Sequence, residues 1–198
     1  MEPMKRRAGL SHAPRRCAES GMTFAEIVVV MIVMLIAVSI FSTTVVSTAR
    51  QRNINRERAL AADSVRSLFE EMRNEDFGQI YALYNADPLD DPNGPGTAPG
   101  GFFAITGLNV IPGSPGGVVG RIVFPEVVQT NPTTWELRED VAEPLMGMPR
   151  DISGDGFVDE QDHRGDYVIL PIQAIVQWRG VLGNQELIEF TMLTELAL

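Results

Sequence analysis

The feature that most constrains this chain is a stretch of 56 residues, Met22 to Phe77, without one glycine or proline. The following residues, 78–198, contain 16 glycines and 11 prolines. Because glycine and proline are the residues that most often end helices, the contrast separates the chain into two parts. The sequence predicts one long helix, followed by a sheet connected by many loops.

The predicted helix has two halves of different character. Residues 27–41 are apolar except for one serine, and with their flanks they reach the roughly 20 residues that a bilayer requires. Further along, apolar residues recur at helical spacing between charged ones, namely Ala61, Val65, Leu68 and Met72. We therefore expect a transmembrane helix over residues 22–44 and an amphipathic helix over residues 45–77 that packs on the sheet.

The charge of the chain is unevenly distributed. Residues 1–21 hold five of the 16 basic residues but only two of the 26 acidic ones, so the rest of the chain is strongly acidic. An acidic body argues against nucleic acid as a partner. The single cysteine, Cys17, excludes an internal disulfide.

A carboxylate near the start of the apolar segment needs a physical explanation. A charge such as that of Glu26 costs about 2.5 to 3.5 kcal/mol at the centre of a membrane helix. The small residue Gly21 lies before the apolar segment, whereas a secretory signal peptide has its small-residue cleavage site after it. Cleavage after Gly21 would leave the apolar segment on the mature chain, with a new amine on Met22.

This arrangement resembles the prepilin N-terminus of type IV pilins and type II secretion pseudopilins. The resemblance covers about the first quarter of the chain: the basic leader, Gly21, the segment Met22-Thr23-Phe24-Ala25-Glu26, and the apolar run to Phe41. Met22 stands where the family more commonly has Phe. The resemblance implies that a prepilin peptidase removes the leader, residues 1–21, and that the Met22 amine is methylated. It also implies polymerisation with other pilin or pseudopilin subunits through the apolar helix.

The same resemblance implies a place in the cell. The chain would cross the inner membrane once, with its C-terminal domain outside the cytoplasm, in contact with membrane lipid and the inner-membrane assembly platform. It would then enter the filament. There the Met22 amine of one subunit could neutralise Glu26 of a neighbour, and this pair would fix the register of the subunits. The alternative is a carboxylate that reaches the membrane edge.

Residues 78–198 are expected to form a loop-rich antiparallel sheet domain. Tyr167–Trp178 and Leu187–Leu196 have strand composition, and the glycine-containing segment between them indicates a hairpin. Pro171 restricts the start of its strand to an edge or a bulge. Three further apolar runs are expected to add to the sheet: Phe102–Ile105, Val118–Phe124 and the weaker Thr133–Arg138. The predicted fold class is α+β and pilin-like.

The segment DISGDGFVDEQD, residues 151–162, matches the spacing of a twelve-residue calcium loop. Gly156 occupies the position of the sharp turn. The ligand positions fall on Asp151, Ser153, Asp155, the Phe157 carbonyl, Asp159 and Asp162. The last ligand is aspartate, which resembles the dockerin variety of the loop, and the preceding residues are not helical. The sequence predicts calcium as a cofactor; the alternative is an acidic turn in water.

No catalytic constellation is present in the sequence. His12 lies in the leader, and His163 has no cysteine or second mature histidine with which to form a zinc set. We therefore expect a non-enzymatic minor pilin or pseudopilin; a major subunit is disfavoured by the long loops and the acidity. The alternative from another class is a single-pass, membrane-anchored, calcium-dependent binding protein that does not polymerise.

Overall fold

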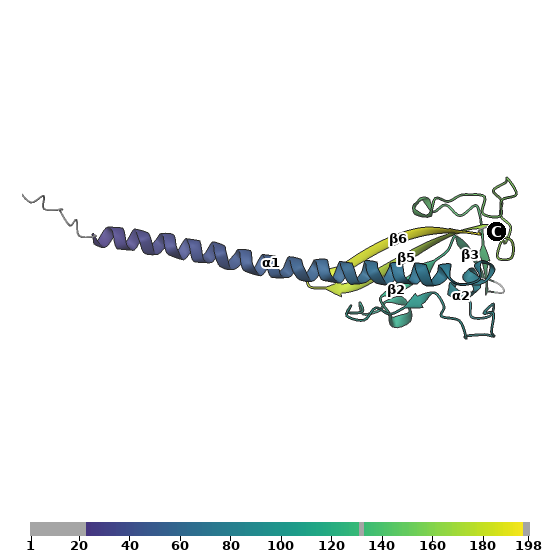
Figure 1. Cartoon of the computed structure of the whole chain (residues 1–198), viewed down its shortest axis with the longest axis horizontal. Coiled ribbons are helices and arrows are strands. Elements are labelled where there is room, and N and C mark those ends of the chain that lie inside the picture. The colour runs from purple at the N-terminus through teal and green to yellow at the C-terminus, as the bar shows by residue number, and fades with distance from the viewer. Residues whose placement is uncertain (1–22, 131–132, 196–198) are drawn as a thin grey trace, which may run out of the picture. The chain divides into compact units, whose positions relative to one another are not determined.

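The computed structural model describes residues 23–130 and 133–195. It divides into two compact units, residues 1–47 and 48–198, which are described separately. Helix α1, Phe24–Arg73, is 50 residues long and contributes to both units (Figure 1). The prediction of one long helix is thus confirmed. It ends slightly earlier than predicted, where the Asn74 side chain donates a hydrogen bond to the Glu70 carbonyl at 2.8 Å.

The first unit is a helix with apolar side chains on every side. Every described residue from Thr23 to Ser47 is exposed. By length and composition, α1 is long and apolar enough to cross a membrane near the N-terminus of the chain. The predicted leader, residues 1–21, and the predicted first mature residue, Met22, lie outside the described residues.

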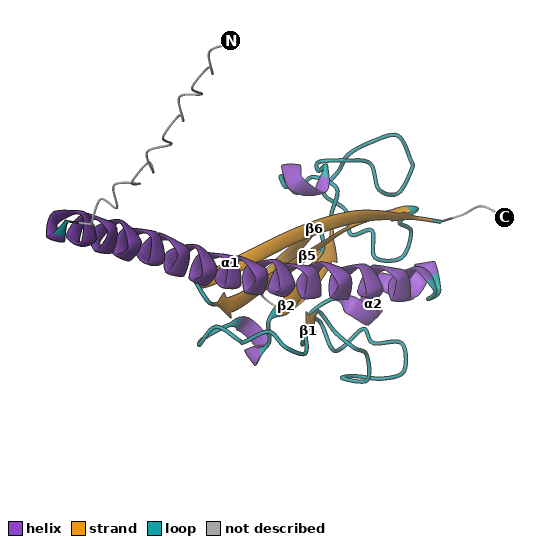
Figure 2. Cartoon of the chain, turned by 60° about the vertical axis from the view of Figure 1, so that its left-hand side comes forward, coloured by secondary structure: helices purple, strands orange, loops and turns teal. Residues whose placement is uncertain are grey.

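The second unit contains a four-stranded antiparallel sheet, with α1 lying across one of its faces (Figure 2). In spatial order its strands are β1 (Phe102–Phe103), β2 (Gly120–Val123), β5 (Ile169–Gly180) and β6 (Gly183–Thr194). A separate two-stranded sheet pairs β3 (Glu126–Thr130) with β4 (Thr133–Leu137). The antiparallel sheet predicted for residues 78–198 is confirmed.

The predicted hairpin is the pair β5–β6. Its register is unbroken from Ile169 opposite Thr194 to Gly180 opposite Gly183, which leaves a two-residue turn. Pro171 therefore causes no bulge. Pairing of β5 with β2 reaches only to Gln173, so Pro171 has a neighbouring strand on one side alone and its missing N–H removes no hydrogen bond from the sheet.

The core lies between the second half of α1 and the sheet. The buried residues of α1 are Ile54, Ala61, Val65, Phe69 and Met72. The predicted apolar stripe of α1 is therefore correct except at one position. Leu68 is only half-buried, and the neighbouring Phe69 is buried in the core instead. Alternate residues of β5, which share one face of a strand, are all fully buried: Ile172, Ala174, Val176 and Trp178.

Two polar contacts define the direction of α1 relative to the sheet. The Trp178 indole N–H donates to Glu57 at 3.1 Å, next to the hairpin turn. Sixteen residues later in α1, Arg73 donates to Thr191 at 3.5 Å, near the end of β6. Within the second unit, α1 therefore runs parallel to β6, and the part of α1 with which this unit begins lies near the hairpin turn.

Two elements were not predicted. Helix α2, Ile80–Tyr84, follows a short 3-10 turn, and its five residues are too few to show a helical period. Strand β3, Glu126–Thr130, is a five-residue strand between Pro125 and a second short strand. Helix α2 is stabilised by burial of side chains such as Tyr81 and Tyr84, whereas β3 is held by its pairing with β4.

A half-buried carboxyl group, that of Glu126, joins these two elements. The Tyr81 hydroxyl donates to Glu126 at 3.0 Å, and burial raises the pKa of Glu126 from 4.5 to about 7. Because the folded chain holds this proton more tightly than the unfolded chain, protonation stabilises the fold. That stabilisation is complete below pH 4.5 and is lost as the pH rises through about 7.

We therefore predict that Glu126→Gln stabilises the protein at alkaline but not at acidic pH. At about pH 8 the variant should exceed the wild type by on the order of 2 kcal/mol in the free energy of unfolding, and the difference should shrink toward pH 5. Denaturant unfolding across this range measures it. Parallel pH profiles for the two proteins would contradict the raised pKa.

Candidate functional site

The acidic loop, residues 151–162, lies in the long connection between β4 and β5, and its carboxylates organise its own backbone. Asp151 accepts hydrogen bonds from the N–H groups of Gly154 at 2.5 Å and Gly156 at 2.9 Å. Asp155 accepts from Phe157 and Asp159 accepts from Gln161, each at 2.8 Å. Turns of this kind fold the backbone around the carboxylates of Asp151, Asp155 and Asp159.

The carboxylates at both ends of this wrapped segment favour the charged state. Partial burial raises the pKa of Asp151, but hydrogen bonds from Gly154 and Gly156 outweigh it, so the pKa is lowered. The backbone N–H of Gln161, together with His163, lowers the pKa of Asp159. Ser153 lies within this segment, with its hydroxyl 3.4 Å from Asp151.

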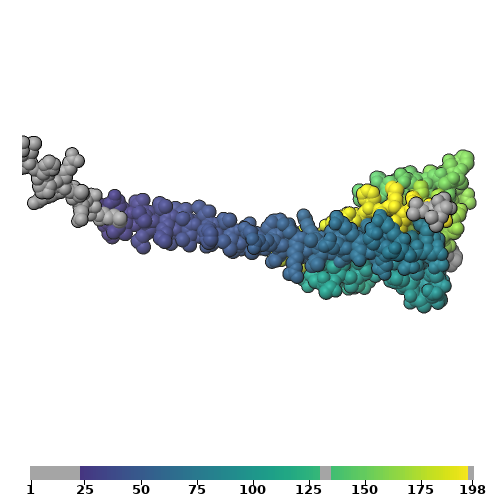
Figure 3. Space-filling model, in the orientation of Figure 1, coloured from purple at the N-terminus to yellow at the C-terminus, as the bar shows by residue number. Residues whose placement is uncertain are grey.

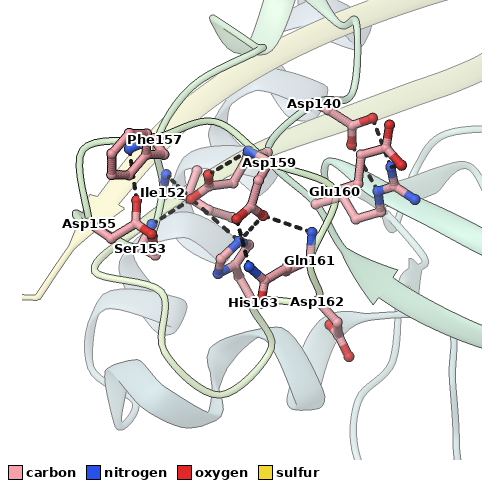
Figure 4. A network of polar contacts seen from close by, with 12 residues as sticks. Asp140, Ile152, Ser153, Asp155, Phe157, Asp159, Glu160, Gln161, Asp162 and His163 are labelled. Atoms are coloured by element: carbon pink, nitrogen blue, oxygen red, sulfur yellow. Dashed lines mark hydrogen bonds and ion pairs between the residues drawn. The ribbon is translucent and has the colours of Figure 1, made fainter.

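The final predicted ligand, Asp162, has other partners in this structure. One carboxylate oxygen accepts from the Leu137 N–H at 3.2 Å, and the other accepts from the Arg164 side chain at 2.8 Å. Figure 4 shows its carboxylate pointing away from Asp159 and His163. Asp162 therefore fixes the loop to β4, and its role as a calcium ligand stays a prediction.

A group of three side chains that could hold a metal ion is formed by the buried Glu139 and His163 and by the half-buried Asp159 of the loop itself. Figure 4 shows Asp159 and His163 close together. The ligating atoms of the three side chains lie within 4.8 Å of one another. The His163 Nε2 atom is 3.2 Å from Asp159 Oδ1 and 3.7 Å from Glu139 Oε1. An imidazole and two carboxylates together are ligands that suit a transition metal. Without a metal, the same two carboxylates can pair with a protonated His163.

Glu139 is the buried centre of this arrangement. Its side chain is fully buried and accepts hydrogen bonds from the N–H groups of Ile152 at 2.7 Å and Ser153 at 2.9 Å. Its second oxygen accepts from the Asp159 N–H at 3.4 Å. A carboxylate without such partners would be very costly to bury, so these bonds fix the backbone of the loop onto the end of β4.

His163 has a carboxylate at each ring nitrogen. Its Nδ1 lies 3.1 Å from Asp166 Oδ1, on the opposite side from Asp159. Burial lowers the pKa of His163, but hydrogen bonds to Asp159 and Asp166 outweigh it and raise the pKa. As an imidazolium, His163 donates to both carboxylates; as a neutral ring, it can keep the bond to Asp166 and direct Nε2 at a metal.

Sequence reasoning missed Glu139 and set His163 aside. Glu139 lies 12 residues before the loop, at the end of a strand, and no local motif connects the two. His163 follows the last loop position directly, which was the one available signal. That signal points to a site only when His163 is considered together with Glu139, and only the fold brings these two residues close.

Glu26, the predicted assembly residue, has a local partner at the start of α1. Its carboxylate accepts hydrogen bonds from the Thr23 N–H at 2.9 Å and the Thr23 hydroxyl at 3.2 Å. In return, the Glu26 N–H donates to the Thr23 hydroxyl at 3.4 Å. This is a capping box, which satisfies two N–H groups at the helix start. The Thr-x-x-Glu spacing typical of a capping box is present in the sequence at Thr23 and Glu26.

Comparison of the chain with family models, with curated proteins and with solved structures finds no match. The fold and the site together define the class of protein on their own. It is an α+β domain joined to a helix that is long and apolar enough to cross a membrane. The domain also contains a buried Glu/Asp/His group that could hold a metal ion.

Proposed function

We propose that this chain is a minor subunit of a type IV pilus or a type II secretion pseudopilus, with an assembly role and no catalytic one. The observation that supports it best is the division of α1. Between Thr23 and Ser47 all its side chains are exposed, whereas from Ile54 onward one face is buried in the core of a sheet domain.

An apolar helix exposed on every side requires lipid or other apolar helices around it. A filament subunit needs both surroundings in turn, lipid before assembly and neighbouring subunits afterwards. The position of Gly21 before the apolar segment also supports this function, because cleavage there retains the helix on the mature chain. A non-polymerising membrane anchor would need only the lipid.

Processing of the leader tests the proposal. We predict a mature chain that begins Met22-Thr23-Phe24-Ala25-Glu26 and carries a methylated amine on Met22. Intact-mass analysis of membranes from the native host measures this directly. A mature species that starts at Met1, or one cut beyond Phe41, would contradict the pilin proposal and favour the single-pass binding protein.

We further propose that calcium occupies the acidic loop and acts as a structural cofactor. The support is the placement of Asp151, Asp155 and Asp159 on three successive turns, each with its carboxylate already bonded to loop backbone. Calcium prefers such oxygen ligands from a flexible loop. It would hold the connection between β4 and β5 in one conformation and so offer a fixed surface to other subunits.

A further inference from the structure

Exposed arginines gather at the end of the second unit where its part of α1 begins. Between residues 48 and 62, α1 carries four arginines and a single acidic residue, Glu57, whose carboxylate is already bonded to Trp178. Strand β5 adds the exposed Arg179 just before the hairpin turn. In a chain with a net charge of -10, basic charge is therefore concentrated at this end. The four arginines of α1, none with an ion-pair or hydrogen-bond partner in the part of the chain that the structure describes, are Arg50, Arg52, Arg56 and Arg58.

The arginines of α1 surround the helix and do not line one face of it. Successive helical residues differ by about 100° in direction, so Arg50 and Arg58 flank the buried Ile54, whereas Arg52 and Arg56 lie on the opposite side. A protein partner would contact one side of α1 and leave the arginines of the other side unused. The headgroup layer of a membrane surrounds any helix that passes through it. A ring of arginines therefore suits anionic lipid headgroups better than it suits a protein.

The turn of the β5–β6 hairpin exposes two apolar side chains at the same end. Val181 is 52% exposed and Leu182 is 63% exposed. A two-residue hairpin turn in water usually contains Asn, Asp or Gly. A third exposed apolar residue, Val110, lies close by, because its neighbour Asn109 accepts a hydrogen bond from the Arg179 N–H at 2.8 Å. Exposed apolar side chains next to arginines are typical of surfaces that lie in a membrane interface.

The ring of arginines and the apolar turn lie at nearly the same level along α1. Gly180 lies against the helix, since a Cβ atom there would be 2.6 Å from the Glu57 carboxylate. From Glu57 back to Arg50 the helix spans about 10 Å, and from Gly180 the turn extends in the same direction by roughly 5 Å. A headgroup layer is about 5 to 8 Å thick, so it can contact both. In Figure 3 the yellow surface of the hairpin lies beside the blue surface of α1 at the narrow end of this unit.

We propose that this end of the second unit docks onto an anionic lipid surface. The arginines of α1 bind headgroup phosphates, and the turn, Val181–Leu182, inserts among the headgroups. Lipid is the occupant because the arginines directly follow the exposed apolar part of α1, which extends to Ser47. The same surface repels the acidic remainder of the domain, which turns the basic end toward it. The inference rests on the proposed function, in which α1 spans a membrane, and adds a second contact that holds the sheet domain against the membrane before assembly.

Fluorescence quenching of the full, uncleaved chain in lipid nanodiscs tests this contact. In a Cys17→Ser background, an environment-sensitive fluorophore is attached through Asn184→Cys, next to the turn, or through Thr194→Cys, its matched control at the other end of β6. Both positions are exposed, and a strand of ten residues separates them by roughly 33 Å. In phosphatidylglycerol nanodiscs, we expect nitroxide-labelled headgroups to quench position 184 several-fold more than position 194. The difference should shrink in neutral phosphatidylcholine.

Two sets of substitutions then identify the groups responsible. Arg52→Gln with Arg56→Gln should reduce quenching at position 184 several-fold, whereas Arg66→Gln with Arg73→Gln, further along the same helix, should not. Val181→Asn with Leu182→Gly replaces the apolar turn by a common hairpin turn, so the hairpin should still fold. Quenching at position 184 should nevertheless fall to the level of position 194. Quenching that neither set of substitutions changes would overturn the proposal.

Three outcomes separate this inference from the function on which it rests. Equal quenching at positions 184 and 194 would overturn the membrane contact and leave processing after Gly21 standing. Failure of cleavage after Gly21 in the native host would overturn the filament function but not a contact measured on the uncleaved chain. If nanodiscs show no contact and Arg52→Gln with Arg56→Gln still prevents incorporation into filaments, the arginines bind an acidic partner subunit and the lipid proposal is wrong.

Discussion

Replacement of Glu26 by leucine is expected to prevent the chain from entering filaments while leaving its membrane insertion intact. Insertion should not suffer, because leucine is favoured in lipid and a carboxylate is not. Assembly should fail, because the proposed partner, the Met22 amine of a neighbouring subunit, would be buried without a counter-charge. Breaking a buried ion pair on one side typically costs about 3 to 5 kcal/mol, enough to exclude a subunit.

The capping box at Thr23 makes the glutamine variant the decisive control. Glutamine can still accept the hydrogen bond from the Thr23 N–H, but it carries no charge. If the charge sets the register, Glu26→Gln should fail as completely as Glu26→Leu. Immunoblots of membrane and sheared-filament fractions compare the two variants. Normal incorporation of the glutamine variant would assign Glu26 to helix capping alone.

Calcium is expected to raise the melting temperature of the protein by several degrees relative to chelator. Without a cation, the loop carboxylates repel one another, and a divalent cation replaces that repulsion with attraction. Calcium binds the folded loop and not the open chain, so at about 100 times its dissociation constant it should stabilise the fold by roughly 2.7 kcal/mol. Magnesium should do much less, because it requires a smaller and more regular site.

Two substitutions distinguish calcium binding by the loop from metal binding by Glu139, Asp159 and His163, which share only Asp159 with the loop. Asp155→Ala removes a loop ligand and should abolish the calcium shift, whereas His163→Gln should retain most of it. If a transition metal bound by Glu139, Asp159 and His163 is the natural occupant, zinc should give the larger shift and His163→Gln should abolish it. Equal melting curves with and without calcium up to about 10 mM would leave the loop as an acidic turn.

The main elements of the fold and their order along the chain were predictable, because a few strong signals in the sequence determine them. Helix α1 follows from the absence of glycine and proline, and the β5–β6 hairpin follows from strand composition around a glycine-containing turn. The prediction of which face of α1 is buried was nearly correct. The error at Leu68 and Phe69 arose because adjacent residues on a helix differ by only about 100° in direction, and the tilt against the sheet decides which is buried.

The candidate site was predictable only in its local part. The acidic loop is a continuous motif, so spacing alone identified it. Glu139 and His163 could not be paired from spacing, because their meeting depends on how the connection folds back against β4. Asp162 shows the converse: its spacing predicts a ligand, but Arg164 and the Leu137 N–H are nearer partners in this fold.

The place of β5 in the sheet has a consequence for the order in which this protein can fold. Strand β5 lies between β2 and β6 and supplies Trp178 and Val176 to the core, yet it comes late in the chain. During synthesis, the apolar face of α1 therefore stays uncovered until about 100 further residues, including β5, have been made. Long waits of this kind expose apolar surface to aggregation and slow the closing of the core. A chain that stops before residue 169 would keep the apolar helix but lose the sheet domain, so the domain can fold only when synthesis of the chain is almost complete.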